Sequence, residues 1–283
     1  MERYLILNAD DFGMCFSANE AVEDLFRNGF LTSATLMPPC PWAEDAVGRM
    51  KQCKSMNVGL HITTTAEYDF YKWAPLHRDV PSLRDRKGYF YTTAKESLAH
   101  ATEWDMAKEI KAQYDFMEVR GCLPDHLDNH MATVYGLLGP SYLKIVFELC
   151  GSRGLAFRLP RGSDGDEKAQ AKASAAAELA EHYGVGILDR LATCDFDVEP
   201  GDSYEGFRDY YLSLVHACVP GVNEIFMHPC VENDEVKHIN AQWKKRVWEH
   251  RLMQDDILHR AICSEGIRLV SWAQAPFSRR NDI

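Results

Sequence analysis

Several aspartates and histidines directly follow short apolar stretches of the sequence. Asp10 and Asp11 come after YLIL, His61 after VGL, His130 after PDHLDN, and His228 after EIFM. Carboxylates and imidazoles are the side chains that bind divalent cations and transfer protons near neutral pH. Their recurrence at the ends of separate apolar stretches predicts one shared polar site, provided that the fold brings these ends together.

The adjacent carboxylates Asp10 and Asp11 suit a hydrolytic site. Neighbouring residues of an extended segment point to opposite sides, whereas a turn at a strand end directs both into one pocket. One carboxylate would then bind a cation while the other accepts a proton from water. The alternative is a polar loop that caps the following helix.

The histidines extend this pattern to a set of metal ligands. A lone histidine such as His61 is often a packed core residue. On a strand, His126, Asp128 and His130 share one face, and His130 lies farther toward the strand end. We therefore favour His130 as a ligand and give His126 a supporting or structural role. Two histidines with one aspartate leave coordination positions open for water and substrate, so the combination favours a metal site.

Three further residues are candidates for catalysis or substrate binding. His228 suits a general acid opposite the base, or is an ordinary turn histidine. Arg158 is the single charge in FRLP, where it orients the base, binds a substrate oxygen or lies on a solvated face. Trp73 would stack on a sugar ring or, alternatively, anchor its loop.

Strand-like and helix-like segments alternate along the chain, which predicts parallel βαβ units. The expected strands are Tyr4–Ala9, Thr32–Met37, Asn57–Thr63, Leu123–Asp128, Ala156–Leu159, Gly186–Leu188, Glu224–Met227 and Ile267–Val270. The expected helices are Ser17–Phe30, Asp105–Arg120, Ser141–Ser152, Ala169–His182, Tyr204–Cys218 and Ile239–Ser264. This rhythm predicts an α/β fold, a (β/α) barrel-like domain of seven or eight parallel strands spanning 1–283, with a long loop near 64–98. In such a barrel the carboxyl ends of the strands meet at one rim, where active sites are built.

Composition excludes several classes of partner. The chain has 283 residues with 31 Lys+Arg against 42 Asp+Glu, a net charge of -11, which disfavours a nucleic-acid partner. Its apolar runs are far shorter than the ~20 residues of a membrane span, so we expect no membrane partner. The nine cysteines form no CxxC pair, which is typical of a reducing compartment, and we expect a cytoplasmic protein.

Longer motifs carry a resemblance to a known family. They are LILNADDFG at 5–13, NGFLTSATLM at 28–37, VGLHIT at 58–63, PDHLDNH at 124–130 and MHP at 227–229. In this order and spacing, the sequence resembles the YdjC-like carbohydrate deacetylases, relatives of the chitooligosaccharide deacetylases. The resemblance implies a barrel-like fold and a hydrolase that removes the N-acetyl group from a small acetylated saccharide.

The resemblance also implies a role for each site residue. Asp11, His61 and His130 would hold one divalent ion, Mg by family habit, although Zn or Mn suits imidazole ligands at least as well. Asp10 would be the general base and His228 the general acid. Two other functions remain open: a non-haem iron oxygenase with the same ligand set, and a catalytically silent carbohydrate-binding protein. A homodimer is equally open.

Overall fold

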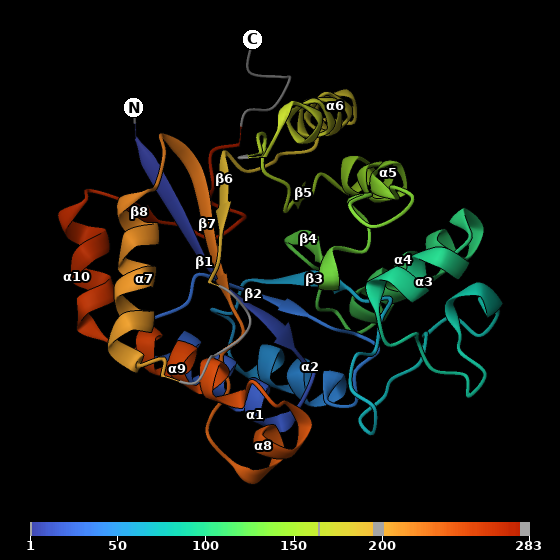
Figure 1. The fold of residues 1–283 in the computed structure, drawn as a ribbon, viewed down its shortest axis with the longest axis horizontal. Coiled ribbons are helices and arrows are strands. Elements are labelled where there is room, and N and C mark those ends of the chain that lie inside the picture. The colour runs from blue at the N-terminus through green and yellow to red at the C-terminus, as the bar shows by residue number, and fades with distance from the viewer. Residues whose placement is uncertain (1, 164, 195–200, 278–283) are drawn as a thin grey trace.

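Eight parallel strands form the sheet of the computed structural model (Figure 1), which describes residues 2–163, 165–194 and 201–277. The strands are β1 (Arg3–Phe12), β2 (Ser33–Leu36), β3 (Val58–Ile62), β4 (His126–Asn129), β5 (Ala156–Phe157), β6 (Arg190–Ala192), β7 (Gly221–Met227) and β8 (Arg268–Leu269). Seven of them follow the order β5-β4-β3-β2-β1-β7-β6, and β8 pairs with the first half of β1. All these pairs are parallel. The prediction of a barrel-like α/β fold with seven or eight parallel strands is confirmed.

The two ends of this curled sheet meet through a few backbone hydrogen bonds. Phe157 N donates to Gly186 O and Leu188 N donates to Leu159 O, both at 2.9 Å. The segment Gly186–Leu188, expected to be a strand, contributes these bonds, a third in which Arg161 N donates to Leu188 O at 2.9 Å, and one bridge to Pro160, while β6 begins at Arg190. The wall of the barrel is therefore short between β5 and β6.

Helices cover the outside of the sheet. They are α1 (Phe16–Arg27), α2 (Ala43–Gln52), α3 (Ala94–His100), α4 (Glu103–Glu118), α5 (Leu143–Arg153), α6 (Glu167–His182), α7 (Tyr204–His216), α8 (Asp234–Ile239), α9 (Trp243–Met253) and α10 (Asp256–Ser264), with short 3₁₀ turns η1 (Pro81–Leu83) and η2 (His130–Ala132). No described helix combines the length and the apolar character needed to cross a membrane.

The predicted helices differ from the observed ones at α2, α3 and α8 and in the C-terminal region. α3 begins within the segment 64–98, which was expected to be a long loop, and α8 precedes the helix expected from Ile239. α2 was not expected, because it follows the prolines of PPCPW and buries only Ala43, Ala46 and Val47. The single helix expected at Ile239–Ser264 is divided into α9 and α10. The side chain of Asp255 accepts a hydrogen bond from Ile257 N and caps α10, and this local bond competes with continuation of α9.

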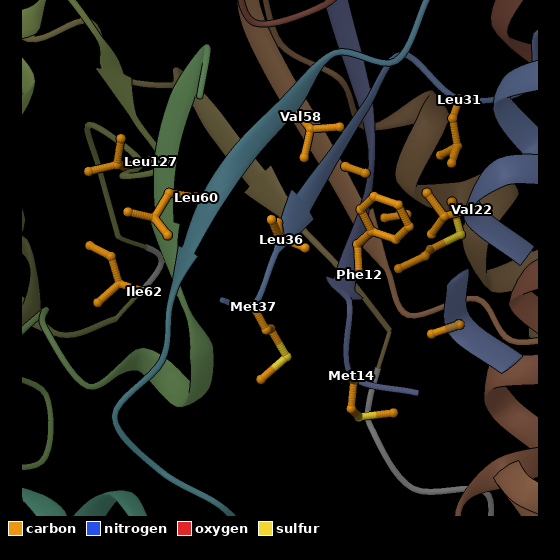
Figure 2. Packing of buried hydrophobic residues seen from close by; sticks show 14 of the residues in the cluster. Phe12, Met14, Val22, Leu31, Leu36, Met37, Val58, Leu60, Ile62 and Leu127 are labelled. Atoms are coloured by element: carbon orange, nitrogen blue, oxygen red, sulfur yellow. The ribbon is translucent and has the colours of Figure 1, made fainter. Parts of the chain in front are cut away.

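The two faces of β1 have different surroundings. Leu5, Leu7 and Ala9 point outward into the main hydrophobic core, which lies between the sheet and the helices. Figure 2 shows part of this core, where Phe12 from β1 lies near Leu36 and Val58. On the inner face, Ile6 belongs to a small apolar cluster with Trp272 that fills one end of the barrel. The following inward residues are polar, so the barrel interior changes from apolar to charged toward the carboxyl ends of the strands.

The absence of a side chain at Gly59 leaves room inside the barrel for the stacked rings of His126 and Trp272. A Cβ atom at Gly59 would lie 2.4 Å from Cε1 of His126 and 2.5 Å from its Nδ1. The imidazole of His126 is itself stacked on Trp272, with 4.4 Å between ring centroids. Because His126 and Trp272 are both buried, the imidazole of His126 has no space to move away from an added Cβ at position 59.

We therefore expect Gly59→Ala to lower the free energy of unfolding by about 1–3 kcal/mol, the usual cost of overpacking a core. Urea denaturation measures this change. Gly48→Ala is the matched control, because a Cβ at this α2 position meets nothing within 4 Å and alanine is favoured over glycine in helices by about 1 kcal/mol. Equal stabilities of the two variants would contradict the packing argument.

Candidate metal centre and active site

A bulge at the end of β1 turns both aspartates into one cavity. The register with β2 shifts between Ala9 and Phe12, and Asp11 has a left-handed backbone with φ 62. Such a bulge re-aims side chains that would otherwise alternate. Asp10 and Asp11 both line a cavity of about 700 Å³ at the carboxyl end of the barrel.

Asp11, His61 and His130 converge in this cavity. Asp11 Oδ1 lies 3.5 Å from His61 Nε2 and 3.3 Å from His130 Nδ1. One potential ligand atom from each residue falls within 4.8 Å of the others, and all three side chains are buried. Neither carboxylate oxygen of Asp11 makes a well-aligned hydrogen bond. A carboxylate and two imidazole nitrogens with this spacing fit one divalent cation.

Carboxylates behind the histidines orient their rings. Asp128 Oδ1 lies 2.6 Å from His61 Nδ1, and Glu67 Oε2 lies 3.0 Å from His130 Nε2. Each contact turns the other ring nitrogen toward Asp11, which is the usual arrangement of metal-binding histidines. A second group of Asp10, His61 and Asp128 is also close, but both of its carboxylates already contact Arg158.

The electrostatics of this cluster strongly favour positive charge. Burial alone would lower the pKa of His61, but Asp128, Asp10 and Asp11 raise it to about 9. Burial would also lower the pKa of His130, but Glu67 and Asp11 raise it to about 10. Burial would raise the pKa of Asp11, yet Arg246 and the two histidines hold it well below its usual range. In the absence of a metal, protons occupy the positions that a cation would take.

Arg158 is bound to Asp10 inside the barrel. Its two terminal nitrogens donate to both oxygens of Asp10 at 2.7 Å, and the guanidinium also contacts Asp128 at 2.6 Å and Glu224 at 2.5 Å. Because only 3% of Arg158 is exposed, the interpretation as a residue on a solvated face is wrong. Its hydrogen bonds to Asp10 match the alternative in which it orients the base.

His228 follows β7 and lines the same cavity. Its backbone N donates to Glu249 Oε2 at 2.9 Å, which fixes the strand end against α9. Burial lowers the pKa of His228 to about 3, with Arg246 and Lys245 acting in the same direction and Asp11 opposing them. The imidazole is therefore neutral at pH 7 and must gain a proton before it can act as an acid.

His126 and Trp73 lie away from the Asp11 cluster. His126 is stacked on Trp272 and its Nδ1 contacts Asp125 at 2.6 Å. Trp73 is only 2% exposed and donates from Nε1 to Thr65 O at 2.7 Å, and it is not among the residues lining the cavity. This placement contradicts the expectation that Trp73 stacks on a sugar ring; it anchors its loop instead.

Sequence reasoning missed five charged residues of this region, one of which is Glu249, the partner of the His228 backbone. Glu67, Arg246 and Lys245 line the cavity, and Glu224 lies behind Arg158 with a pKa that burial raises to about 7. An acidic residue inside the apolar strand VNEIFM was a usable signal for Glu224. Nothing in the sequence distinguished Glu67 from the other charges of its long loop, or Arg246 from those of α9.

Comparison with known proteins identifies the family. The profile of the YdjC-like protein family matches residues 4–264. The chain belongs to the YdjC-like family. A protein of Geobacillus stearothermophilus named carbohydrate deacetylase is 26% identical over 97% of this chain and 98% of its own length. One of Salmonella typhimurium strain LT2 named chitooligosaccharide deacetylase is 27% identical over 80% of this chain and 90% of its own.

A solved structure shares the fold of this YdjC-like chain. The crystal structure of a protein from Enterococcus faecalis V583 superposes with a TM-score of 0.77 at 23% identity. The match covers 96% of this chain and 98% of the other. At this identity the likeness shows a common fold, and the predicted family assignment is confirmed by the profile match.

The raised pKa values predict that binding of a cation is coupled to proton release. A histidine with a raised pKa keeps its proton until the pH exceeds that value, so between pH 6 and 9 a cation competes with these protons, and each rise in pH weakens the competition. We expect Mn²⁺ to displace about two protons per ion at pH 7 and to bind more tightly as the pH rises. Calorimetric titration in two buffers of different ionisation enthalpy measures the protons released. An affinity that does not change with pH would contradict this coupling.

Proposed function

We propose that this chain is a metal-dependent deacetylase that hydrolyses the N-acetyl group of a small acetylated sugar. The observation that carries the proposal is the meeting of Asp11, His61 and His130 beside the separately held carboxylate of Asp10. The named deacetylases among its relatives, which align over most of their length, support the same reaction.

The three clustered side chains would hold the metal through Asp11 Oδ1, His61 Nε2 and His130 Nδ1. A divalent ion bound there supplies Lewis-acid polarisation of the acetyl carbonyl and lowers the pKa of a coordinated water. Two imidazoles and one carboxylate suit Zn or Mn as well as the Mg implied by family resemblance.

In this proposal Asp10 is the general base. Its two oxygens are held by Arg158 and Asn8, and Oδ2 lies 3.9 Å from His61 Nε2. A carboxylate oxygen has more than one lone pair, so these bonds orient Asp10 and leave it able to accept a proton from the attacking water. Arg158 then acts by positioning the base and does not bind the sugar.

His228 is the proposed proton donor to the leaving amine. Since its imidazole is neutral in the resting site, it has to gain a proton during the reaction before donating it to nitrogen. The bound substrate and the charge changes around Asp11 are the factors that would raise its basicity at that stage. A histidine serves such a role because it accepts and donates protons through different ring nitrogens.

Acetate release from a panel of N-acetylated mono- and disaccharides, with added divalent ions, tests the function. We expect turnover that a chelator abolishes and a divalent ion restores, and Asp10→Asn should lower kcat by about 100-fold or more, as expected for loss of a general base. Asp125→Asn is the matched control, because Asp125 contacts His126 and lies outside the cavity. Turnover that is insensitive to chelation, or normal in Asp10→Asn, would reject the mechanism.

Metal content distinguishes the two candidate histidines. His130→Ala should lose most of the bound ion, because one of three ligands is missing, whereas His126→Ala should retain it after correction for the fraction folded. Elemental analysis after dialysis gives the occupancy, and circular dichroism gives the folded fraction. Retention by His130→Ala together with loss by His126→Ala would reassign the ligand.

A further inference from the structure

A second cavity, of about 790 Å³, adjoins the catalytic one. Tyr135, Leu137 and Leu191 line both. The second cavity lies outside the short wall formed by β5 and β6, beneath α6, which Figure 1 shows near α5 and β5. Each volume falls within the 300–1,000 Å³ typical of ligand sites.

The barrel wall between the two cavities is one strand thick. Arg158 lines the catalytic cavity, and the next residues, Leu159 and Pro160, line the second. Tyr135 lies at the junction, where its hydroxyl donates to Arg158 O at 2.6 Å. The junction is therefore fixed to the residue that holds Asp10, and Tyr135 lies where the two cavities adjoin.

Leucine, valine, proline and alanine residues make up half of the lining of the second cavity, and the charged residues Asp166, Lys168, Lys172, Asp189 and Arg190 also line it. Leu143, Leu159 and Val219 contribute from the barrel side, and α6 contributes the small residues Ala169, Ala173 and Ala176. Of the 16 residues of α6, only Ala180 is buried. The helix thus presents three alanines, flanked by Lys168, Gln170 and Lys172, to a space that no described side chain fills.

Exposed apolar residues lie at the rim of the catalytic cavity, and one of them, Leu137, also lines the second cavity. Leu137 is 64% exposed and Leu138 is 59% exposed, and Met131, 40% exposed, follows the proposed ligand His130. All three line the catalytic cavity. Clustered apolar surface of this kind indicates binding of an apolar group. A sugar that carries only hydroxyl substituents would leave this surface exposed to water.

We propose that the second cavity binds an apolar chain carried by the acylated amino sugar, so that the preferred substrate is amphiphilic. This inference rests on the proposed deacetylase function and deepens it by naming the substrate class. The chain would enter either as an alkyl group on the glycosidic oxygen or as an N-acyl group longer than acetyl. Both place hydrocarbon against the same leucines and alanines.

Four substrates separate these sources: N-acetylglucosamine, its octyl β-glycoside, N-octanoylglucosamine and N,N′-diacetylchitobiose. Burial of about two methylene groups gives a tenfold gain in affinity. We therefore expect a KM at least tenfold lower for one of the two octyl-bearing substrates than for N-acetylglucosamine. A lower KM for the alkyl glycoside would show that the second cavity binds the alkyl group on the glycosidic oxygen. A lower KM for N-octanoylglucosamine would show that it binds the N-acyl chain.

Ala173→Trp, which fills the second cavity, should remove the gain and leave kcat/KM for N-acetylglucosamine within twofold of the parent. Ala175→Trp is the matched control, because Ala175 is exposed on the same helix and does not line the cavity. Thermal melting of both variants checks that α6 remains folded. The proposal is overturned if neither octyl-bearing substrate has a lower KM than N-acetylglucosamine, if the lower KM persists in Ala173→Trp, or if only the disaccharide has a lower KM.

A binding measurement keeps this test separate from that of the proposed function. Titration of octyl β-glucoside, which has no amide, into the chain reports the second cavity without turnover. Saturable binding that Ala173→Trp weakens by tenfold or more supports the proposed role of the second cavity, whether or not acetate is released. Failure to release acetate would reject the deacetylase proposal alone. Absence of such binding in a chain that does release acetate would overturn the cavity proposal alone.

Discussion

The ion pairs of Arg158 inside the barrel determine the geometry of the site. One guanidinium contacts Asp10, Asp128 and Glu224, all of them buried. Isolated buried carboxylates are costly, and removal of their common partner would leave several of them uncompensated. Burial raises the pKa of Glu224 to about 7, although the charge of Arg158 acts to lower it. The cluster is therefore held together by shared charge.

This network also gives the two adjacent aspartates different surroundings. Asp10 is paired with Arg158, whereas Asp11 is paired with Arg246 at 2.8 Å and faces the two histidines. Asp128 contacts both Arg158 and the imidazole of His61, so the same residues fix the proposed base and one proposed ligand. A displacement of Arg158 would consequently disturb both the orientation of Asp10 and the metal site.

The sequence predicted those parts of the structure that follow from local patterns and parallel topology. Alternation of strands and helices predicted the sheet, and parallel strands place their carboxyl ends together, which explains why Asp10, Asp11, His61, His130 and His228 were recognised as neighbours. Arg246 and Glu67 could not be recognised, because their contacts depend on how α9 and the long loop pack against the barrel. Trp73 was misjudged for the same reason: an aromatic residue in a loop is buried or exposed according to packing that its neighbours in sequence do not specify.

Backbone strain at the rim connects the fold to the two cavities. Among the described residues, the non-glycine residues with positive φ are Asp11, Met131 and Ala132, and all three line the catalytic cavity. Left-handed backbone at such residues costs of the order of 1 kcal/mol each and persists only where surrounding contacts impose it. At Asp11 the strain turns a carboxylate toward His61 and His130. At Met131 and Ala132 it ends β4 abruptly, which leaves His130 facing the cluster and directs the following segment, with Leu137 and Leu138, along the rim toward the second cavity. The proposed ligand His130 and the exposed leucines that follow it therefore both depend on this turn, so a change in its backbone would shift them together.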